Sequence, residues 1–138
     1  MRYLIDTNIL IRLKTDKAGL SKDVLQIIED PENLIYVSAA SVWEIYMLMH
    51  GEKIHVPAWK CARDVFDTIK KELGYTVNYI KEEHLLTFAG LAPVKNHTDP
   101  FDRMIVAQAI TEEMPLISSD TNMKHYRRQT LDFIPNTP

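Results

Sequence analysis

The sequence predicts an α/β fold, a three-layer α/β/α sandwich in which a mostly parallel central sheet is covered by helices on both faces. Short apolar runs alternate along the chain with segments whose apolar residues recur at helical spacing. Such alternation is typical of right-handed βαβ units. The chain of 138 residues contains no repeat and no linker. A single domain over residues 1–138 is therefore expected.

Five short runs are expected to form the strands of this sheet. They are rich in apolar, β-branched and aromatic residues, and turn-forming residues or helical spacing follow them. The predicted strands are residues 2–5, 34–37, 75–80, 116–118 and, more weakly, 131–134.

The segments between these runs carry the end signals of helices. Ser38 is the expected N-cap of a helix that ends near Gly51, and Pro57 is expected to open a long helix that Gly74 terminates. The predicted helices begin at Ile9 and Ser38 and cover residues 20–29, 58–73, 82–90, 100–113 and 122–127.

Composition excludes several classes of protein. An apolar fraction of 46% and a charged fraction of 25% argue against disordered, fibrous and disulfide-rich chains. The apolar stretches fall short of the ~20 residues that span a bilayer, and the first residues have a strand pattern instead of a signal peptide pattern. We therefore expect a cytoplasmic protein without a membrane partner. The single cysteine, Cys61, is expected to be buried or half-buried.

A net charge of -3 argues against a nucleic-acid partner, because phosphate binding usually needs a basic surface. The objection weakens if divalent cations neutralise several carboxylates. The mouth of such a site would then be flanked by the basic run that contains Lys124, His125, Arg127 and Arg128.

Two acidic residues stand out in the first half of the chain. Asp6 follows the first predicted strand, where a parallel sheet presents its functional groups, and Thr7 and Asn8 come directly after it. It can equally be the N-cap of the first helix. Glu44 interrupts an apolar helical segment, so it either faces solvent or is buried and needs a partner.

Further acidic residues lie in the second half. Asp99 and Asp102 open a helix, where they fit the N-cap and third positions and also a cation site; we favour Asp102 as a ligand and Asp99 as cap or outer group. Arg103 is interpreted as an ion-pair partner of a carboxylate. Asp120, after Ser119 and the fourth strand, either caps a short helix or faces Asp6 across a crevice.

Together these groups predict a hard-oxygen metal site. Oxygen ligands without a cysteine or histidine cluster suit Mg²⁺ or Mn²⁺ and disfavour structural zinc. The histidines lack ligand spacing and are expected on the surface or in loops: His50, His55, His84, His97 and His125. No glycine-rich phosphate loop and no GxSxG motif is present, which argues against P-loop and serine hydrolase chemistry.

Four blocks of the sequence resemble the PIN domain family, and within it the VapC-like toxins of toxin-antitoxin pairs. They are "YLIDTNILI", "VSAASVWEI", "HTDPFDRMIVAQA" and "PLISSD", in this order along the whole chain. The resemblance implies a parallel α/β/α sandwich and a Mg²⁺- or Mn²⁺-dependent endoribonuclease that cuts RNA. It also implies a small antitoxin partner and a homodimer.

The resemblance assigns roles to individual residues. The four acidic ligands fall on Asp6, Glu44, Asp102 and Asp120. An additional acidic position of the subgroup with the DPFDR string falls on Asp99, and supporting polar positions fall on Asn8 and Ser119. The segment "YMLMHGEK" departs from related chains, which often carry a basic helix end there.

Two other functions remain open from the sequence. One is a PIN nuclease that processes RNA or acts on DNA. The other is a non-catalytic binding module, in which the acids only cap helices and a helical row of Tyr46, Met47 and Met49 binds a partner. We interpret that row as core, because methionines readily fill irregular interiors.

Overall fold

The computed structural model describes residues 1–138 and contains a five-stranded sheet in which every neighbouring pair of strands is parallel. The strand order is β3-β2-β1-β4-β5, so the winding direction reverses between β1 and β4. The strands are β1 (Arg2–Ile5), β2 (Leu34–Ser38), β3 (Thr76–Asn78), β4 (Leu116–Ser118) and β5 (Phe133–Pro135). The predicted α/β class and parallel sheet are confirmed.

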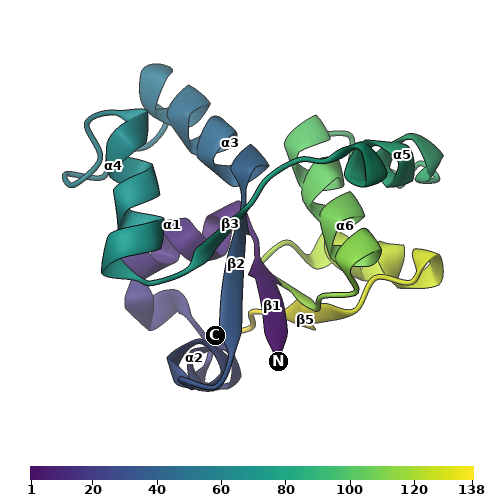
Figure 1. Ribbon diagram of the computed structural model, residues 1–138, viewed down its shortest axis with the longest axis horizontal. Helices are drawn as coiled ribbons and strands as arrows, with labels where there is room; N and C mark the ends of the chain where they lie inside the picture. The colour runs from purple at the N-terminus through teal and green to yellow at the C-terminus, as the bar shows by residue number, and fades with distance from the viewer.

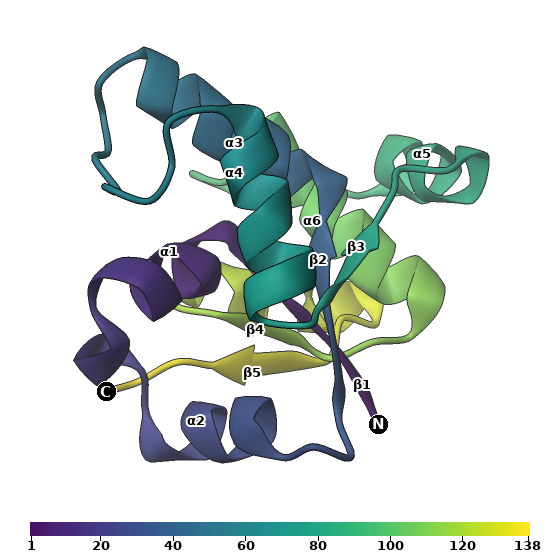
Figure 2. The ribbon, with the colours of Figure 1, turned by 60° about the vertical axis from the view of Figure 1, so that its left-hand side comes forward.

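Helices cover both faces of the sheet, as Figure 1 shows. The α-helices are α1 (Thr7–Thr15), α2 (Lys22–Glu29), α3 (Ala39–His50), α4 (Ala62–Asp67), α5 (Glu82–Gly90) and α6 (Pro100–Glu112). Three further turns of helix are η1 (Lys17–Gly19), the π-helical η2 (Thr68–Glu72) and the 3-10 helix η3 (Thr121–Gln129). Helices α1, α2 and α4 lie on one face, and α5, α6 and η3 on the other (Figure 1 and Figure 2).

The central strand β1 supplies both halves of the core. Its side chains alternate between the two faces of the sheet, so Ile5 packs with α1, α2 and α4 while Leu4 packs with α6 and η3. Both side chains are fully buried. A sheet buried on both faces explains why its strands read as continuous apolar runs.

Short polar side chains begin most of the helices, as the sequence predicted. Ser38 Oγ accepts a hydrogen bond from Ala40 N at 3.0 Å at the start of α3. Asp6, Asp99 and Asp120 cap α1, α6 and η3 in the same way. Several helices therefore begin at the carboxyl edge of the sheet, where α3 and α6 rise on either side of it (Figure 1).

The predicted helix over residues 58–73 was wrong at its start. Helix α4 begins only at Ala62, because the chain first turns back to bury Trp59, whose Nε1 donates to Thr68 Oγ1 at 2.9 Å. The helix then widens into the π-helical turn η2 before Gly74, which has a φ of 69°. Cys61 is exposed at the N-cap of α4, so the prediction of a buried thiol was also wrong.

Some element ends differ from the predictions by a few residues. The third strand covers only Thr76–Asn78, the last strand lies at Phe133–Pro135, and the last helix is a 3-10 helix. None of the helices has both the length and the apolar character needed to cross a lipid bilayer.

The burial of β1 gives a stability prediction with a matched control. We expect Leu4→Ala to lower the free energy of unfolding by about 2 to 5 kcal/mol, because it leaves a cavity in the core. Leu34→Ala removes the same atoms from β2, where the side chain is 56% exposed, and should cost less than about 0.5 kcal/mol. Urea unfolding measures both; equal losses would contradict the assignment of the core.

Candidate active site

Asp6 lies at the centre of the site, directly after β1. Its side chain is 2% exposed. Oδ1 accepts a hydrogen bond from Thr7 N at 2.8 Å, and Oδ2 accepts one from Ser118 Oγ at 2.6 Å. Burial raises the pKa of Asp6, although the hydrogen bonds from Ser118 and Thr7 act in the opposite direction. The carboxylate is therefore held in one orientation.

Asn8 ties the ends of β1 and β4 together. Its Nδ2 donates to Asp6 Oδ2 and to Ser118 Oγ, each at 3.2 Å, and its Oδ1 accepts from Ser119 N at 3.0 Å. Ser118 Oγ also accepts from Asp120 N at 2.9 Å. The two strand ends thus form one hydrogen-bonded unit at the point where the sheet reverses direction, which is where open α/β sheets bind ligands.

Ser119 contributes to this unit through its backbone only. Its hydroxyl accepts a hydrogen bond from Asn136 Nδ2 at 2.9 Å and does not contact Asp6. The hydroxyl that does contact Asp6 belongs to Ser118, a residue that the sequence analysis treated only as part of a strand. Successive side chains of an extended chain point in opposite directions, so the residue after Ser118 points away from Asp6.

Asp102 brings α6 into the cluster. Asp99 is the N-cap of α6 and accepts from Phe101 N at 2.8 Å, while Asp102 lies in the first turn. The pKa of Asp102 is raised to about 8, first by burial and then by the negative charges of Asp6, Glu44, Asp99 and Asp120. Carboxylates from four separate segments are therefore close enough to repel one another.

Glu44 completes the cluster from α3. It is half-buried, and its Oε1 is buried without any hydrogen-bond partner. The Thr7 hydroxyl donates to Ser41 Oγ at 2.9 Å. Burial raises the pKa of Glu44, and the neighbouring Thr7 hydroxyl acts to lower it. The charges of Asp6 and Asp99 raise this pKa further. Ligation of a cation by this unpaired oxygen would offset the cost of its burial.

Other residues of α3 are more exposed than the sequence indicated. Tyr46 is 44% exposed and Met47 is 52% exposed, so the interpretation of these two as core was wrong. The physical reason is that α3 turns the side that carries Val42 and Ile45 toward the core, while Tyr46 and Met47 lie on its outer side.

The carboxylates line a pocket of about 260 Å³ at the carboxyl edge of the sheet. Its walls are Asp6, Thr7, Asn8, Ile11, Glu44, Leu48, Asp102 and Asp120. Two sets of ligand atoms lie within 4.8 Å of one another, namely those of Glu44, Asp99 and Asp102 and those of His97, Asp102 and Asp120. Hard oxygen donors with one unpaired buried oxygen fit Mg²⁺ or Mn²⁺.

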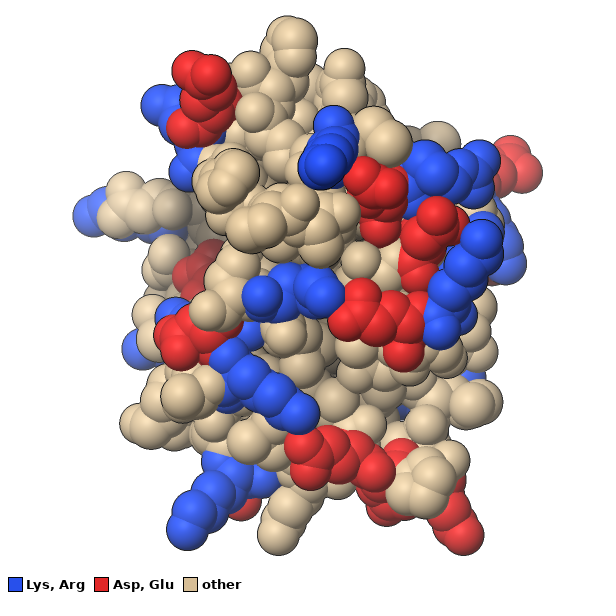
Figure 3. Space-filling model, turned by 90° about the vertical axis from the view of Figure 1, so that its left-hand side faces the viewer, with Lys and Arg blue, Asp and Glu red and all other residues tan.

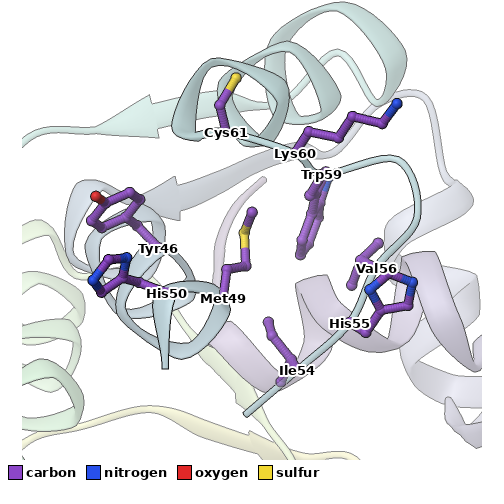
Figure 4. A pocket seen from close by; sticks show the side chains of 9 residues that line it. All are labelled: Tyr46, Met49, His50, Ile54, His55, Val56, Trp59, Lys60 and Cys61. Atoms are coloured by element: carbon purple, nitrogen blue, oxygen red, sulfur yellow. The ribbon is translucent and has the colours of Figure 1, made fainter. Parts of the chain in front are cut away.

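A second hollow lies between α3 and the segment that leads into α4 (Figure 4). Figure 4 shows Met49, Ile54 and Trp59 around its interior and Tyr46 and His50 at one side. No aspartate or glutamate lines it. It therefore provides no carboxylate ligand for a cation and is separate from the carboxylate cluster.

A chain of hydrogen bonds leads from Arg103 through Tyr126 and His97 to Asp120. Arg103 Nη1 donates to the Tyr126 hydroxyl at 3.2 Å, the hydroxyl lies 2.6 Å from His97 Nδ1, and His97 Nε2 lies 3.2 Å from Asp120 Oδ2. A neutral imidazole that donates Nε2–H to the Asp120 carboxylate accepts the Tyr126 proton at Nδ1. Burial raises the pKa of the Tyr126 hydroxyl.

This chain overturns two expectations. Arg103 was expected to pair with a carboxylate, but it donates to Tyr126 and to Leu91 O at 3.2 Å. His97 was expected in a loop or at the surface, yet only 4% of it is exposed. The sequence held one signal: Tyr126 follows Met123 by three residues, an apolar spacing inside a basic run.

His84 is likewise buried, contrary to the sequence-based expectation. It is fully inaccessible to solvent, and its Nδ1 accepts a hydrogen bond from Lys81 N at 3.0 Å at the start of α5. Its Nε2 lies 3.6 Å from Glu112 Oε1. The remaining histidines, His50, His55 and His125, are exposed as expected.

The raised pKa of Asp102 predicts how stability depends on pH in the metal-free protein. A carboxyl group whose pKa rises on folding from 3.8 to about 8 stabilises the fold below the lower value. That stability is lost as the pH rises towards 8. Asp102→Asn cannot ionise. As the pH rises from 5 to 8, the free energy of unfolding of the variant should increase by roughly 1 to 2 kcal/mol relative to that of the wild type. This is less than the full pKa shift would give, because water screens a partly exposed group.

Urea unfolding in EDTA at several pH values measures this difference. A gap between Asp102→Asn and the wild type that stays constant from pH 5 to 8 would show that the carboxylates do not repel one another in the folded state.

Known structures share this fold. The chain is similar to the VapBC2 complex of Rickettsia felis bound to a promoter DNA fragment, with a TM-score of 0.68, 17% identity and coverage of 99% of this chain and 100% of that chain. It is similar to VapBC-1 of nontypeable Haemophilus influenzae, with a TM-score of 0.64, 21% identity and coverage of 98% of each chain.

A third similar structure is VapBC-5 of Mycobacterium tuberculosis, a member of the VapBC family of toxin-antitoxin systems, with a TM-score of 0.58, 15% identity and coverage of 97% of this chain and 98% of that chain. Comparison with curated protein sequences gives no significant match. The family model of the PIN domain matches residues 3–129, which include every carboxylate of the site. This chain therefore belongs to the PIN domain family.

Proposed function

We propose that this protein is a metal-dependent endoribonuclease and the toxin of a toxin-antitoxin pair. The observation that supports the nuclease best is the convergence of Asp6, Glu44, Asp102 and Asp120 in one pocket. Burial alone would disfavour four neighbouring carboxylates, so a compensating cation is the simplest reason for them. Membership of the PIN family, whose domains are generally nucleases, agrees with this reading.

These four side chains are the proposed ligands of Mg²⁺ or Mn²⁺. When bound, such an ion supplies activation of water and neutralisation of the charge that develops on the phosphate. The protein keeps the ligands in place. Ser118 and Asn8 fix Asp6, and His97 fixes Asp120. Because the pKa of Asp102 is raised to about 8, Asp102 would have to give up its proton to act as a ligand at neutral pH.

Asp99 has a different proposed role. Its Oδ1 is occupied by the backbone N–H groups of Phe101 and Asp102, at 2.8 and 3.4 Å. This carboxylate orients the first turn of α6 and thereby Asp102. Its ligand atom also lies within 4.8 Å of those of Glu44 and Asp102. We assign it a supporting role, in which its free oxygen would hold water next to a bound ion.

The partner proposals rest on the comparisons and on exposed apolar surface. The similar structures are described as VapBC toxin-antitoxin complexes, which supports a cognate antitoxin for this chain. Trp43, Tyr46 and Met47 are exposed on α3 at 59%, 44% and 52%. An exposed apolar row of this kind favours a protein partner, either the antitoxin or a second copy in a homodimer.

Cleavage of RNA tests the proposal. We expect wild-type protein with Mg²⁺ or Mn²⁺ to cut a mixed RNA pool at internal sites, and EDTA to stop it. Asp6→Asn should reduce the rate roughly 100-fold or more, because it removes a ligand charge. The control Asp132→Asn changes an exposed aspartate outside the pocket and should cut at the wild-type rate.

Gel analysis with mapped ends measures the cleavage, and DNA of the same sequence shows whether the sugar matters. Wild-type turnover by a folded Asp6→Asn protein would contradict the site assignment. Cleavage of DNA in preference to RNA would replace the ribonuclease by a deoxyribonuclease.

A further inference from the structure

A second polar groove, of about 520 Å³, lies beside the carboxylate cluster. It is formed by the segment before His97 and by η3, and no acidic residue lines it. Its walls are Ala92, Pro93, Val94, Lys95, Asn96, Asn122, His125, Arg128 and Gln129. The cluster described above makes no use of these side chains.

The groove begins where the carboxylate cluster ends. Asn96 directly precedes His97, whose Nε2 lies 3.2 Å from Asp120 Oδ2. On the other wall, Asn122 N donates to Asp120 Oδ1 at 2.9 Å. Asp120 therefore marks the boundary between the two hollows, and an extended ligand at the carboxylates can continue into the groove.

The walls of the groove are fixed relative to each other. The Gln129 side chain accepts from Ala92 N at 2.8 Å and donates to Ala92 O at 3.3 Å, which attaches the loop to η3. His97 N donates to Val94 O at 3.1 Å and closes a tight turn in which Asn96 has a φ of 62°. The turn presents Lys95 at its tip without a need to reorganise on binding.

The two cations that line the groove, Lys95 and Arg128, are exposed and form no ion pair. On the side of α1 and α4, several cations have acidic partners. There Lys14 Nζ lies 2.7 Å from Glu72 Oε1, and basic and acidic side chains are interspersed (Figure 3). Unpaired positive charge in a pre-formed groove is suited to a polyanion.

We propose that this groove binds the phosphate backbone of the RNA strand next to the phosphodiester that is cut. The inference rests on the proposed nuclease function and adds the path of the substrate. Lys95 and Arg128 contact phosphates, while the side-chain amides of Asn96 and Asn122 are placed to reach sugar hydroxyls. No tryptophan, tyrosine or phenylalanine lines the groove, so charge supplies most of the binding and the groove shows no sequence preference.

Binding of a labelled 20-nucleotide RNA tests the groove separately from cleavage. The test pair is Lys95→Gln with Arg128→Gln. The control pair is Lys22→Gln with Lys60→Gln, which removes the same charge from two exposed lysines that also lack ion pairs. Fluorescence anisotropy is measured with Mg²⁺ in an Asp6→Asn background, so that the RNA stays intact, over a series of salt concentrations.

We expect the test pair to bind RNA about tenfold more weakly and to lower the salt slope by about 1.4, or roughly 0.7 for each lost phosphate contact. The control pair should bind like the parent. In the active protein, the test pair should raise KM for the 20-mer and leave kcat unchanged. A dinucleotide, which is too short to reach the groove, should be cut at the same rate by the wild type and by the test pair.

Other outcomes separate this inference from the nuclease proposal. If the wild type cuts RNA but the test pair binds RNA as tightly as the control pair, the proposed role of the groove is wrong and the proposed nuclease activity is supported. Equal weakening by both pairs also overturns the groove, because it shows a general charge effect. If RNA binding depends on the groove but no RNA is cut with metal, the groove is supported and the nuclease fails. Absence of both binding and cleavage overturns both.

Discussion

The site depends on the burial of Asp6 between the ends of β1 and β4. A carboxylate that is 2% exposed is tolerated only with hydrogen bonds, and Ser118, Asn8 and Thr7 supply them. The same contacts join the two strands where the sheet reverses its winding direction. Asp120 then follows at a fixed position, while α3 and α6 approach the same edge from the sides. One buried anion thus specifies the geometry of the whole cluster.

The arrangement of carboxylates that suits a metal site also lowers the stability of the metal-free fold. Asp102 is protonated at neutral pH because its burial and its acidic neighbours disfavour the charge, and Glu44 keeps a buried oxygen without a partner. A divalent cation would reverse both costs at once, since it prefers charged oxygen ligands. His97 Nε2 lies 3.2 Å from Asp120 Oδ2 and 3.6 Å from Asp102 Oδ2, so it holds the strand end and α6 together. Beyond Asp120, the groove with Lys95 and Arg128 is locally basic, although the chain as a whole has a net charge of -3.

Local signals made the strands, most helix starts and the convergence of the carboxylates predictable. Asp6, Asp99 and Asp120 cap helices. Helices of a parallel sheet start at the edge where ligands bind, so residues that cap them are also brought close to one another. Tertiary contacts decided the rest. The burial of Trp59 delays α4, and the partners of His97 lie 23 and 29 residues away. No spacing rule within a single helix or strand contains that information.

Anomalous X-ray scattering from crystals soaked in Mn²⁺ tests the central claim most directly, because it locates the ion without reference to activity. The account predicts the strongest manganese peak in the pocket, within ligand distance of Asp6, Glu44, Asp102 or Asp120. A peak at the acidic group around His84 with none in the pocket would contradict it, as would the absence of any ordered Mn²⁺ at saturating concentration.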